Sequence, residues 1–108
     1  MLSILLIEPY AELRSAIASA LDRAQYRCEA VGSAADAMLK LRAEEYAYIL
    51  VDIDSPDPMS NLCTALKTDP LLLSKVVVIT DGETPNTMAS QPQILKPFDT
   101  DDLLAPLR

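Results

Sequence analysis

A chain of 108 residues, half of them hydrophobic, is long enough for one domain with its own apolar core, predicted here over residues 1–108. The net charge of −7 and the lack of a basic cluster argue against direct binding to nucleic acid. The absence of histidine removes a common metal ligand and general base, and two cysteines are too few for a disulfide framework or a zinc site.

The first apolar run, Ile4–Ile7, stops at Glu8 and Pro9. It is too short for a signal peptide or a membrane span, so we expect a cytoplasmic domain with no membrane contact. Cys28 and Cys63 are interpreted as small buried hydrophobic residues.

The first half of the chain alternates between apolar runs and amphipathic segments. Ser3–Ile7 and the weaker run Arg27–Val31 are predicted strands. Between them, one face of a helix is marked by apolar residues three to four positions apart, at Leu13, Ile17, Leu21 and Ala24. A second helix is predicted over Ala34–Glu45, because Ser33 and Asp36 form a capping pair at its start.

The second half repeats the alternation. Tyr48–Val51 and Val76–Ile79 are continuously apolar, which is typical of strands buried on both faces of a parallel sheet, and Gln93–Leu95 is a short fifth strand. The stretch DGETPNTMASQP, residues 81–92, contains two prolines and a glycine and has almost no apolar face. We therefore expect the helix between the fourth and fifth strands to be shortened or absent.

Two further helices are predicted from capping signals. Asp57, followed by a proline, is a candidate N-cap for a helix that continues through Leu66. Asp99 and Asp102 mark the start of a last helix, which Pro106 limits because its ring clashes with the preceding turn.

This order of elements implies an α/β fold with an open parallel sheet and right-handed crossovers. In such sheets, ligands bind beyond the carboxyl ends of the strands. Glu8, Asp52, Thr80 and Lys96 each end or follow a predicted strand, so we expect them to meet at one edge of the sheet.

The segment YILVDIDSPDP, residues 48–58, crowds three aspartates behind a buried strand, although like charges repel and resist leaving water. A carboxylate such as Asp52 can attack phosphorus, and oxygen ligands suit Mg²⁺. A lysine and a hydroxyl can hold the remaining phosphoryl oxygens. The group of residues therefore predicts phosphoryl chemistry.

Four segments in this order, ILLIEPYAELR, ILVDIDSPDP, VVVIT and LKPF, resemble the receiver domain of two-component response regulators. The resemblance covers nearly the whole chain. It implies a flavodoxin-like, doubly wound, parallel five-stranded sheet with strand order 2-1-3-4-5. It also implies a cis peptide bond before Pro97 and a family-typical proline at Pro56 in the loop after the third strand.

The resemblance also implies the site residues. Asp52 would be the phosphoacceptor, Thr80 the switch hydroxyl and Lys96 the lysine that contacts the phosphoryl group. Mg²⁺ would be held by Glu8, Asp52 and Asp54, the last through its backbone carbonyl.

Three features depart from the family pattern. Pro9 stands where the family has a second acidic residue, which predicts weak Mg²⁺ binding that the side chain of Asp54 could partly restore. Gln93 replaces the usual switch aromatic, and the helix between the fourth and fifth strands is reduced.

The resemblance implies a signalling module and not an enzyme. A sensor histidine kinase or a phosphotransfer protein would supply the phosphoryl group, and the output would pass to an effector domain, a partner protein or a second copy in a homodimer. Two alternatives stay open. One is a pseudo-receiver that binds partners without phosphorylation. The other is a haloacid-dehalogenase-like phosphatase with Asp52 as nucleophile and Asp54 as general acid, although the later acidic motif of that family is not evident in this sequence.

Overall fold

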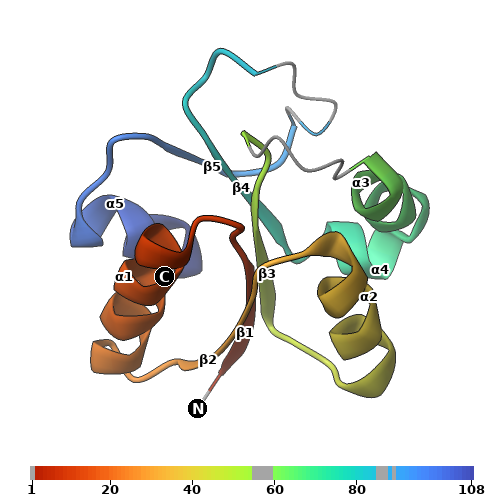
Figure 1. Cartoon of the computed structure of the whole chain (residues 1–108), viewed down its shortest axis with the longest axis horizontal. Helices are drawn as coiled ribbons and strands as arrows, with labels where there is room; N and C mark the ends of the chain where they lie inside the picture. Colours follow the sequence, from red (N-terminus) through yellow and green to blue (C-terminus); the bar gives the residue numbers. More distant parts are fainter. Residues whose placement is uncertain (1, 55–59, 85–87, 89) are drawn as a thin grey trace.

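A parallel sheet of five strands in the order β2-β1-β3-β4-β5 forms the centre of the computed structural model, which describes residues 2–54, 60–84, 88 and 90–108 (Figure 1). The strands are β1 (Ser3–Ile7), β2 (Arg27–Val31), β3 (Tyr48–Asp52), β4 (Val76–Thr80) and β5 (Gln93–Leu95). Every neighbouring pair is parallel. The predicted strand order and the doubly wound, flavodoxin-like topology are confirmed.

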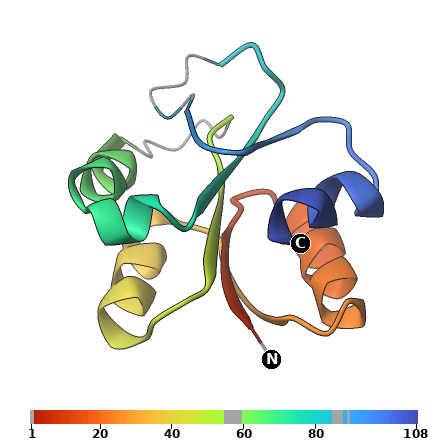
Figure 2. The ribbon, with the colours of Figure 1, turned by 180° about the vertical axis from the view of Figure 1, so that it is seen from behind.

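Helices cover both faces of the sheet, as the views from front and back show (Figures 1 and 2). α1 and α5 lie on one face, and α2, α3 and α4 lie on the other. The helices are α1 (Ala11–Arg23), α2 (Ala34–Ala43), α3 (Ser60–Thr68), α4 (Pro70–Leu73) and α5 (Thr100–Leu104), followed by the short 3₁₀ helix η1 (Ala105–Leu107). None of the helices in the described part of the chain is long and apolar enough to cross a membrane.

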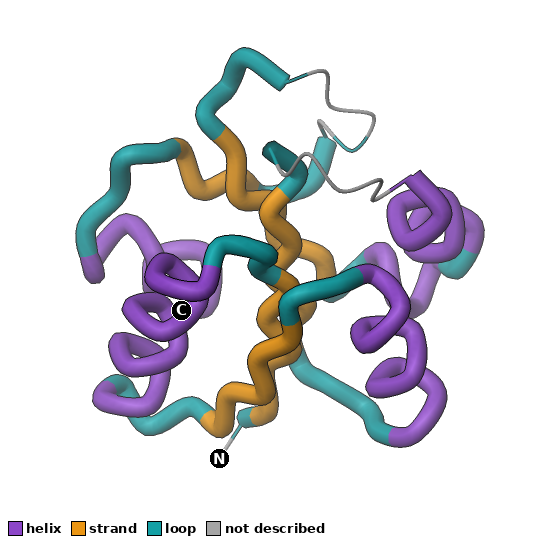
Figure 3. The backbone as a smooth tube through the Cα atoms, viewed as in Figure 1, coloured by secondary structure: helices purple, strands orange, loops and turns teal. Residues whose placement is uncertain are grey.

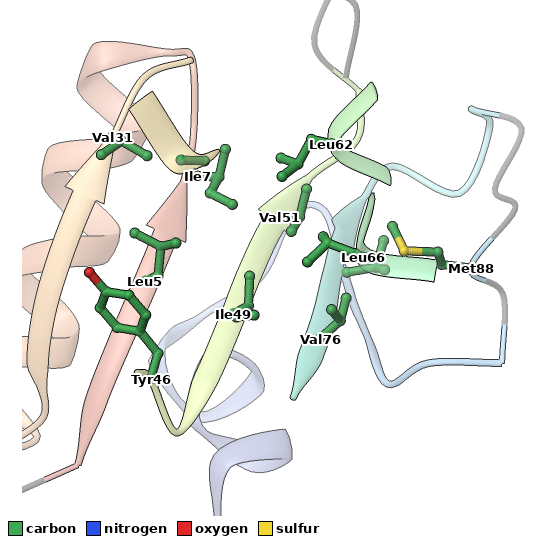
Figure 4. Close-up of a cluster of buried hydrophobic side chains, with 12 residues drawn as sticks. Leu5, Ile7, Val31, Tyr46, Ile49, Val51, Leu62, Leu66, Val76 and Met88 are labelled. Atoms are coloured by element: carbon green, nitrogen blue, oxygen red, sulfur yellow. The ribbon is translucent and has the colours of Figure 1, made fainter. Parts of the chain in front are cut away.

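The continuous apolar runs exist because each central strand packs on two cores. In β3, Ile49 and Val51 point to the core under α2 and α3, while Leu50 points to the core under α1 and α5. Successive side chains of a strand point to opposite faces, so a strand covered on both sides needs an apolar residue at every position. Figure 4 shows the first of these cores, with Leu66 of α3 against the sheet.

Capping residues set the helix boundaries much as predicted. The Ser33 side chain accepts a hydrogen bond from the Asp36 backbone N–H at 3.1 Å at the start of α2. Asp99 and Asp102 form a reciprocal capping box at the start of α5, and the chain tightens into η1 at Pro106, where the helix was expected to stop. The predicted N-cap at Asp57 and the loop proline Pro56 lie outside the described residues.

Several boundaries differ from the sequence-based expectation. The second helix ends at Ala43 and not at Glu45, and two strands extend by one residue each, to Asp52 and Thr80. α4 was not predicted at all. Its signal is Asp69, whose side chain accepts hydrogen bonds from two backbone N–H groups of the turn that begins at Pro70.

The connection between β4 and β5 contains no helix among its described residues, 81–84, 88 and 90–92, in agreement with the predicted reduction. Met88 is only 3% exposed and joins the core under α3 (Figure 4). The Gln91 side-chain amide donates a 2.6 Å hydrogen bond to the Leu73 carbonyl, which ties this connection to α4. These two contacts attach the described residues of the connection to the rest of the domain. Gln93, at the family's aromatic position, is exposed on β5.

Cys28 and Cys63 are free thiols. Each packs against one of the two cores but is half-buried, so the prediction of small buried hydrophobic residues is correct only in part.

The packing of α3 on the sheet gives a test of the core. We expect Leu66→Ala, at a fully buried position, to lower the free energy of unfolding by about 2–5 kcal/mol, because it removes apolar contact and leaves a cavity. The matched control is Leu71→Ala on the neighbouring α4, where the side chain is 65% exposed and we expect a change within about 0.5 kcal/mol. Urea unfolding measures both. Equal losses in the two variants would contradict this packing.

Candidate functional site

The polar residues predicted from the strand ends do meet at one edge of the sheet. Glu8 follows β1, Asp52 ends β3, Thr80 ends β4 and Lys96 follows β5. Figure 3 shows the loops after β3 and β4 rising from the same end of the sheet. Glu8, Asp52 and Thr80 are at most 1% exposed, and they are the buried polar or charged residues of the described chain. Burying polar or charged side chains costs folding free energy, so three of them at a single edge of the sheet indicate a functional site.

An ion pair between Lys96 and Asp52 lies at the centre of this site. The Lys96 Nζ is 2.6 Å from Asp52 Oδ2, and the backbone N–H of Asp54 donates to Asp52 Oδ1 at 2.8 Å. Burial works against the charge of Lys96, but the hydrogen bonds and the charges of Asp52 and Asp54 outweigh it and raise the pKa of the lysine. Lys96 is therefore a fixed positive charge, placed directly before the predicted cis peptide bond to Pro97, which the structure confirms.

The Asp54 side chain is turned toward Thr80. Thr80 Oγ1 donates to Asp54 Oδ1 at 2.9 Å, and the Asp81 backbone N–H donates to Asp54 Oδ2 at 2.6 Å. Lys96 Nζ lies 3.2 Å from the same Oδ2. Burial raises the pKa of this carboxyl, but hydrogen bonds from Thr84, Thr80 and the Asp81 N–H, together with Lys96, lower it below its usual value. Asp54 is therefore held as an ionised acceptor.

Glu8 has the opposite environment. Its side chain is fully buried, and neither carboxylate oxygen has a hydrogen-bond partner among the described residues. Burial first, and the neighbouring Asp52 second, raise the pKa of Glu8 from 4.5 to about 8, against the opposing effect of Lys96. Arg14 donates to the backbone carbonyl of Glu8 at 2.9 Å, so it holds this turn of the chain without neutralising the side chain.

The predicted Mg²⁺ ligands are only partly arranged for a metal. The unpaired oxygens of Glu8, beside Asp52, fit a hard cation that prefers oxygen ligands. Within the described residues, however, no group of three or more acidic or cysteine side chains is placed to hold a metal. The Asp54 side chain is engaged by Thr80 and Lys96, so its predicted compensation for Pro9 would require it to leave those partners.

Two contributors to the site were missed by the sequence reasoning. The Tyr10 ring lies 5.8 Å from Lys96 Nζ, and residues 81–84 fold back onto Asp54 and Thr80. Gly82 has φ of +86°, a conformation that suits glycine, and its N–H donates to Thr80 Oγ1 at 3.1 Å. Gly82, two positions after Thr80, was the sequence signal that could have predicted this turn of the chain back toward Asp54.

Comparison with solved structures identifies the fold. No protein-family profile and no curated protein matches the sequence. The chemotaxis protein CheY4 of Vibrio cholerae superposes with a TM-score of 0.84 at 20% identity, over 99% of this chain and 96% of that one. The response regulator TrrA of Thermotoga maritima, solved in complex with Mg²⁺-BeF, gives 0.83 at 15% identity, over 99% and 96%. The chain has the CheY-like receiver fold.

Another solved structure with the same fold is a sensor protein from Polaromonas sp. JS666, with a TM-score of 0.80 at 24% identity over 97% of this chain and 91% of that one. Within the receiver fold, Asp52, Thr80 and Lys96 lie at the carboxyl ends of β3, β4 and β5, where ligands bind in doubly wound sheets.

The raised pKa of Glu8 predicts how the stability of this receiver-fold domain depends on pH. The folded state holds the Glu8 proton up to pH about 8, whereas the unfolded state releases it near 4.5. The folded state therefore loses stability as pH rises between these values, through Glu8. We expect Glu8→Gln, which cannot ionise, to match the wild type near pH 4 and to exceed it in unfolding free energy at pH 9.

Urea unfolding in EDTA across this pH range measures the effect. Glu45→Gln, at an exposed position, is the charge-matched control and should follow the wild type throughout. If the difference in unfolding free energy between the wild type and Glu8→Gln does not change with pH, the raised pKa of Glu8 is contradicted.

Proposed function

We propose that this domain is a two-component receiver that accepts a phosphoryl group on Asp52 and signals through altered protein contacts. The observation that supports it is the ion pair of Asp52 with Lys96, beside the Thr80 hydroxyl, at the carboxyl edge of a CheY-like sheet. A carboxylate, a hydroxyl and an ammonium group at one strand edge are the nucleophile and the oxygen-binding groups that phosphoryl transfer requires.

In the proposed reaction, an Asp52 carboxylate oxygen attacks the phosphorus of a phosphohistidine on a sensor histidine kinase or a phosphotransfer protein. A P–O bond to Asp52 forms while the P–N bond breaks, and the histidine leaves with the electron pair of that bond. Lys96 and Thr80 bind the phosphoryl oxygens through charge-assisted and hydroxyl hydrogen bonds. The chain itself has no histidine, which suits an acceptor from a histidine donor.

Mg²⁺ suits the proposed site, with Glu8, Asp52 and the backbone carbonyl of Asp54 as the residues that would hold it. When bound, the ion neutralises charge on the phosphoryl oxygens. The structure of TrrA was solved with Mg²⁺-BeF, which supports the choice of metal for this fold. Pro9 provides no side-chain ligand, so we expect the site to be weak.

The output is proposed to pass to an effector domain, to a partner protein or to a second copy of the chain. A pseudo-receiver that binds partners without phosphorylation is the second candidate, favoured by Pro9 and by the engagement of Thr80 with Asp54. The phosphatase reading has less support, because Asp54, its general acid, has a lowered pKa and accepts hydrogen bonds. An ionised acceptor is a poor proton donor.

Phosphoryl acceptance is tested by mass spectrometry. Incubation with phosphoramidate and Mg²⁺ should add about 80 Da, the mass of one phosphoryl group, to the wild type. Asp52→Asn should abolish the gain because it removes the nucleophile, whereas Asp57→Asn, a control in the same acidic segment, should retain it. A wild type that gains no mass with any donor or metal would favour the pseudo-receiver.

The metal proposal gives a separate prediction. We expect Pro9→Asp to raise Mg²⁺ affinity by about tenfold or more, because it restores a carboxylate next to Glu8. Glu8→Gln should lower the affinity, since it removes a carboxyl group that can give up its proton to bind the metal. Calorimetric titration with MgCl₂ measures both, with Glu45→Gln as the control. Unchanged affinity in both variants would place the metal elsewhere.

A further inference from the structure

The Asp54 carboxylate is surrounded by donors of the kind that bind phosphate. Its two oxygens accept from the Thr80 hydroxyl at 2.9 Å and from the Asp81 N–H at 2.6 Å, with Lys96 Nζ at 3.2 Å. The Thr84 hydroxyl also helps to lower the pKa of the same carboxyl group. Hydroxyl, backbone N–H and ammonium groups converging on one point are a typical oxyanion pocket.

Further hydrogen bonds hold the donors of this pocket in place. The Gly82 N–H donates to Thr80 Oγ1 at 3.1 Å, so the Thr80 proton is directed to Asp54. The Asp81 side chain accepts from the backbone N–H groups of Glu83 and Thr84, which closes the turn around the carboxylate. Asp54 is only 9% exposed at its side chain, so these bonds are largely shielded from water.

The same donors are needed by a phosphoryl group on Asp52. Lys96 bridges the two aspartates, at 2.6 Å from Asp52 and 3.2 Å from Asp54, and Thr80 is already bonded to Asp54. A phosphoryl group on Asp52 would carry its oxygens toward these groups, where a second negative charge now lies. The two anions would repel each other and would compete for the same hydrogens.

We propose that Asp54 is an internal ligand of this oxyanion pocket, which it must vacate before a phosphate-like anion can bind. The tethered carboxylate has a high effective concentration at the pocket, so it outcompetes a dilute free anion. Its departure also removes a hydrogen-bond partner from the Asp81 backbone N–H, so occupancy of the pocket is coupled to the first turn of the β4–β5 connection. The biological meaning rests on the proposed function, but the pocket can be tested without phosphoryl transfer.

The test is a titration of ¹⁵N-labelled protein with inorganic phosphate in EDTA at constant ionic strength, followed by the amide shifts of Asp81 and Gly82. We expect Asp54→Ala, which empties the pocket and removes the charge, to bind phosphate at least about tenfold more tightly than the wild type. Asp54→Asn, which keeps the shape and loses the charge, should lie between them. Glu45→Ala removes a charge at an exposed position and should behave as the wild type.

Affinities that agree within about twofold across the wild type and both Asp54 variants would overturn the proposal. Unfolding midpoints confirm that each variant is folded, and Asp54→Asn carries the test if Asp54→Ala does not fold. Labelling with phosphoramidate separates the two proposals. If Asp54→Ala binds phosphate tightly but neither it nor the wild type gains a phosphoryl group, the internal-ligand proposal stands and the phosphoryl-acceptor function fails.

Discussion

The ion pair between Lys96 and Asp52 is the interaction on which the arrangement of the site depends. Three carboxyl groups, from Glu8, Asp52 and Asp54, meet at one edge of the sheet, and burial together with the neighbouring Asp52 raises the pKa of Glu8. Lys96 contacts two of them, at 2.6 Å and 3.2 Å. Without this ammonium group, the end of β3 would place the buried Asp52 carboxylate in the interior with no cation beside it, at a large cost in folding free energy.

The three carboxyl groups show how environment assigns chemistry to identical side chains. Asp52 pairs with a cation and a backbone N–H, Asp54 accepts several hydrogen bonds, and Glu8 accepts none among the described residues. The pKa of Asp54 falls and that of Glu8 rises. The site thus combines an ion-paired carboxylate at Asp52, a carboxylate at Asp54 that accepts hydrogen bonds from Thr80 and Asp81, and a carboxyl group at Glu8 with a raised pKa. Under the proposed function, the groups proposed to bind the phosphoryl oxygens are thus occupied before any phosphoryl group arrives.

The fold and the location of the candidate site at one edge of the sheet could be predicted from the sequence, because both follow from simple rules. Continuous apolar runs such as Val76–Ile79 mark strands covered on both faces, and the carboxyl ends of parallel strands must meet. These rules predicted that Glu8, Asp52, Thr80 and Lys96 lie at the same edge of the sheet, where the structure places them. The short α4 was missed, because a four-residue helix has too little periodicity and only the Asp69 cap to reveal it.

The direction of the Asp54 side chain could not be predicted, because its partners come from distant parts of the chain. Thr80 is 26 positions away, and the return of residues 81–84 depends on one glycine conformation. The burial of Met88 against the core could not be predicted either, since a single methionine carries no periodic signal. Sequence patterns report on elements, whereas these contacts depend on tertiary packing.

A crystal structure of the protein with Mg²⁺ and beryllofluoride would show whether Asp52 accepts a phosphoryl group and whether Asp54 leaves the pocket, because beryllofluoride on an aspartate mimics a phosphoryl group. We expect the adduct on Asp52, with its fluorine atoms contacting Thr80 and Lys96 and with the Asp54 carboxylate displaced from both. A structure with no adduct, or with an adduct on another carboxylate, would contradict the assignment of Asp52. An adduct on Asp52 that leaves Asp54 bonded to Thr80 would contradict its role as an internal ligand.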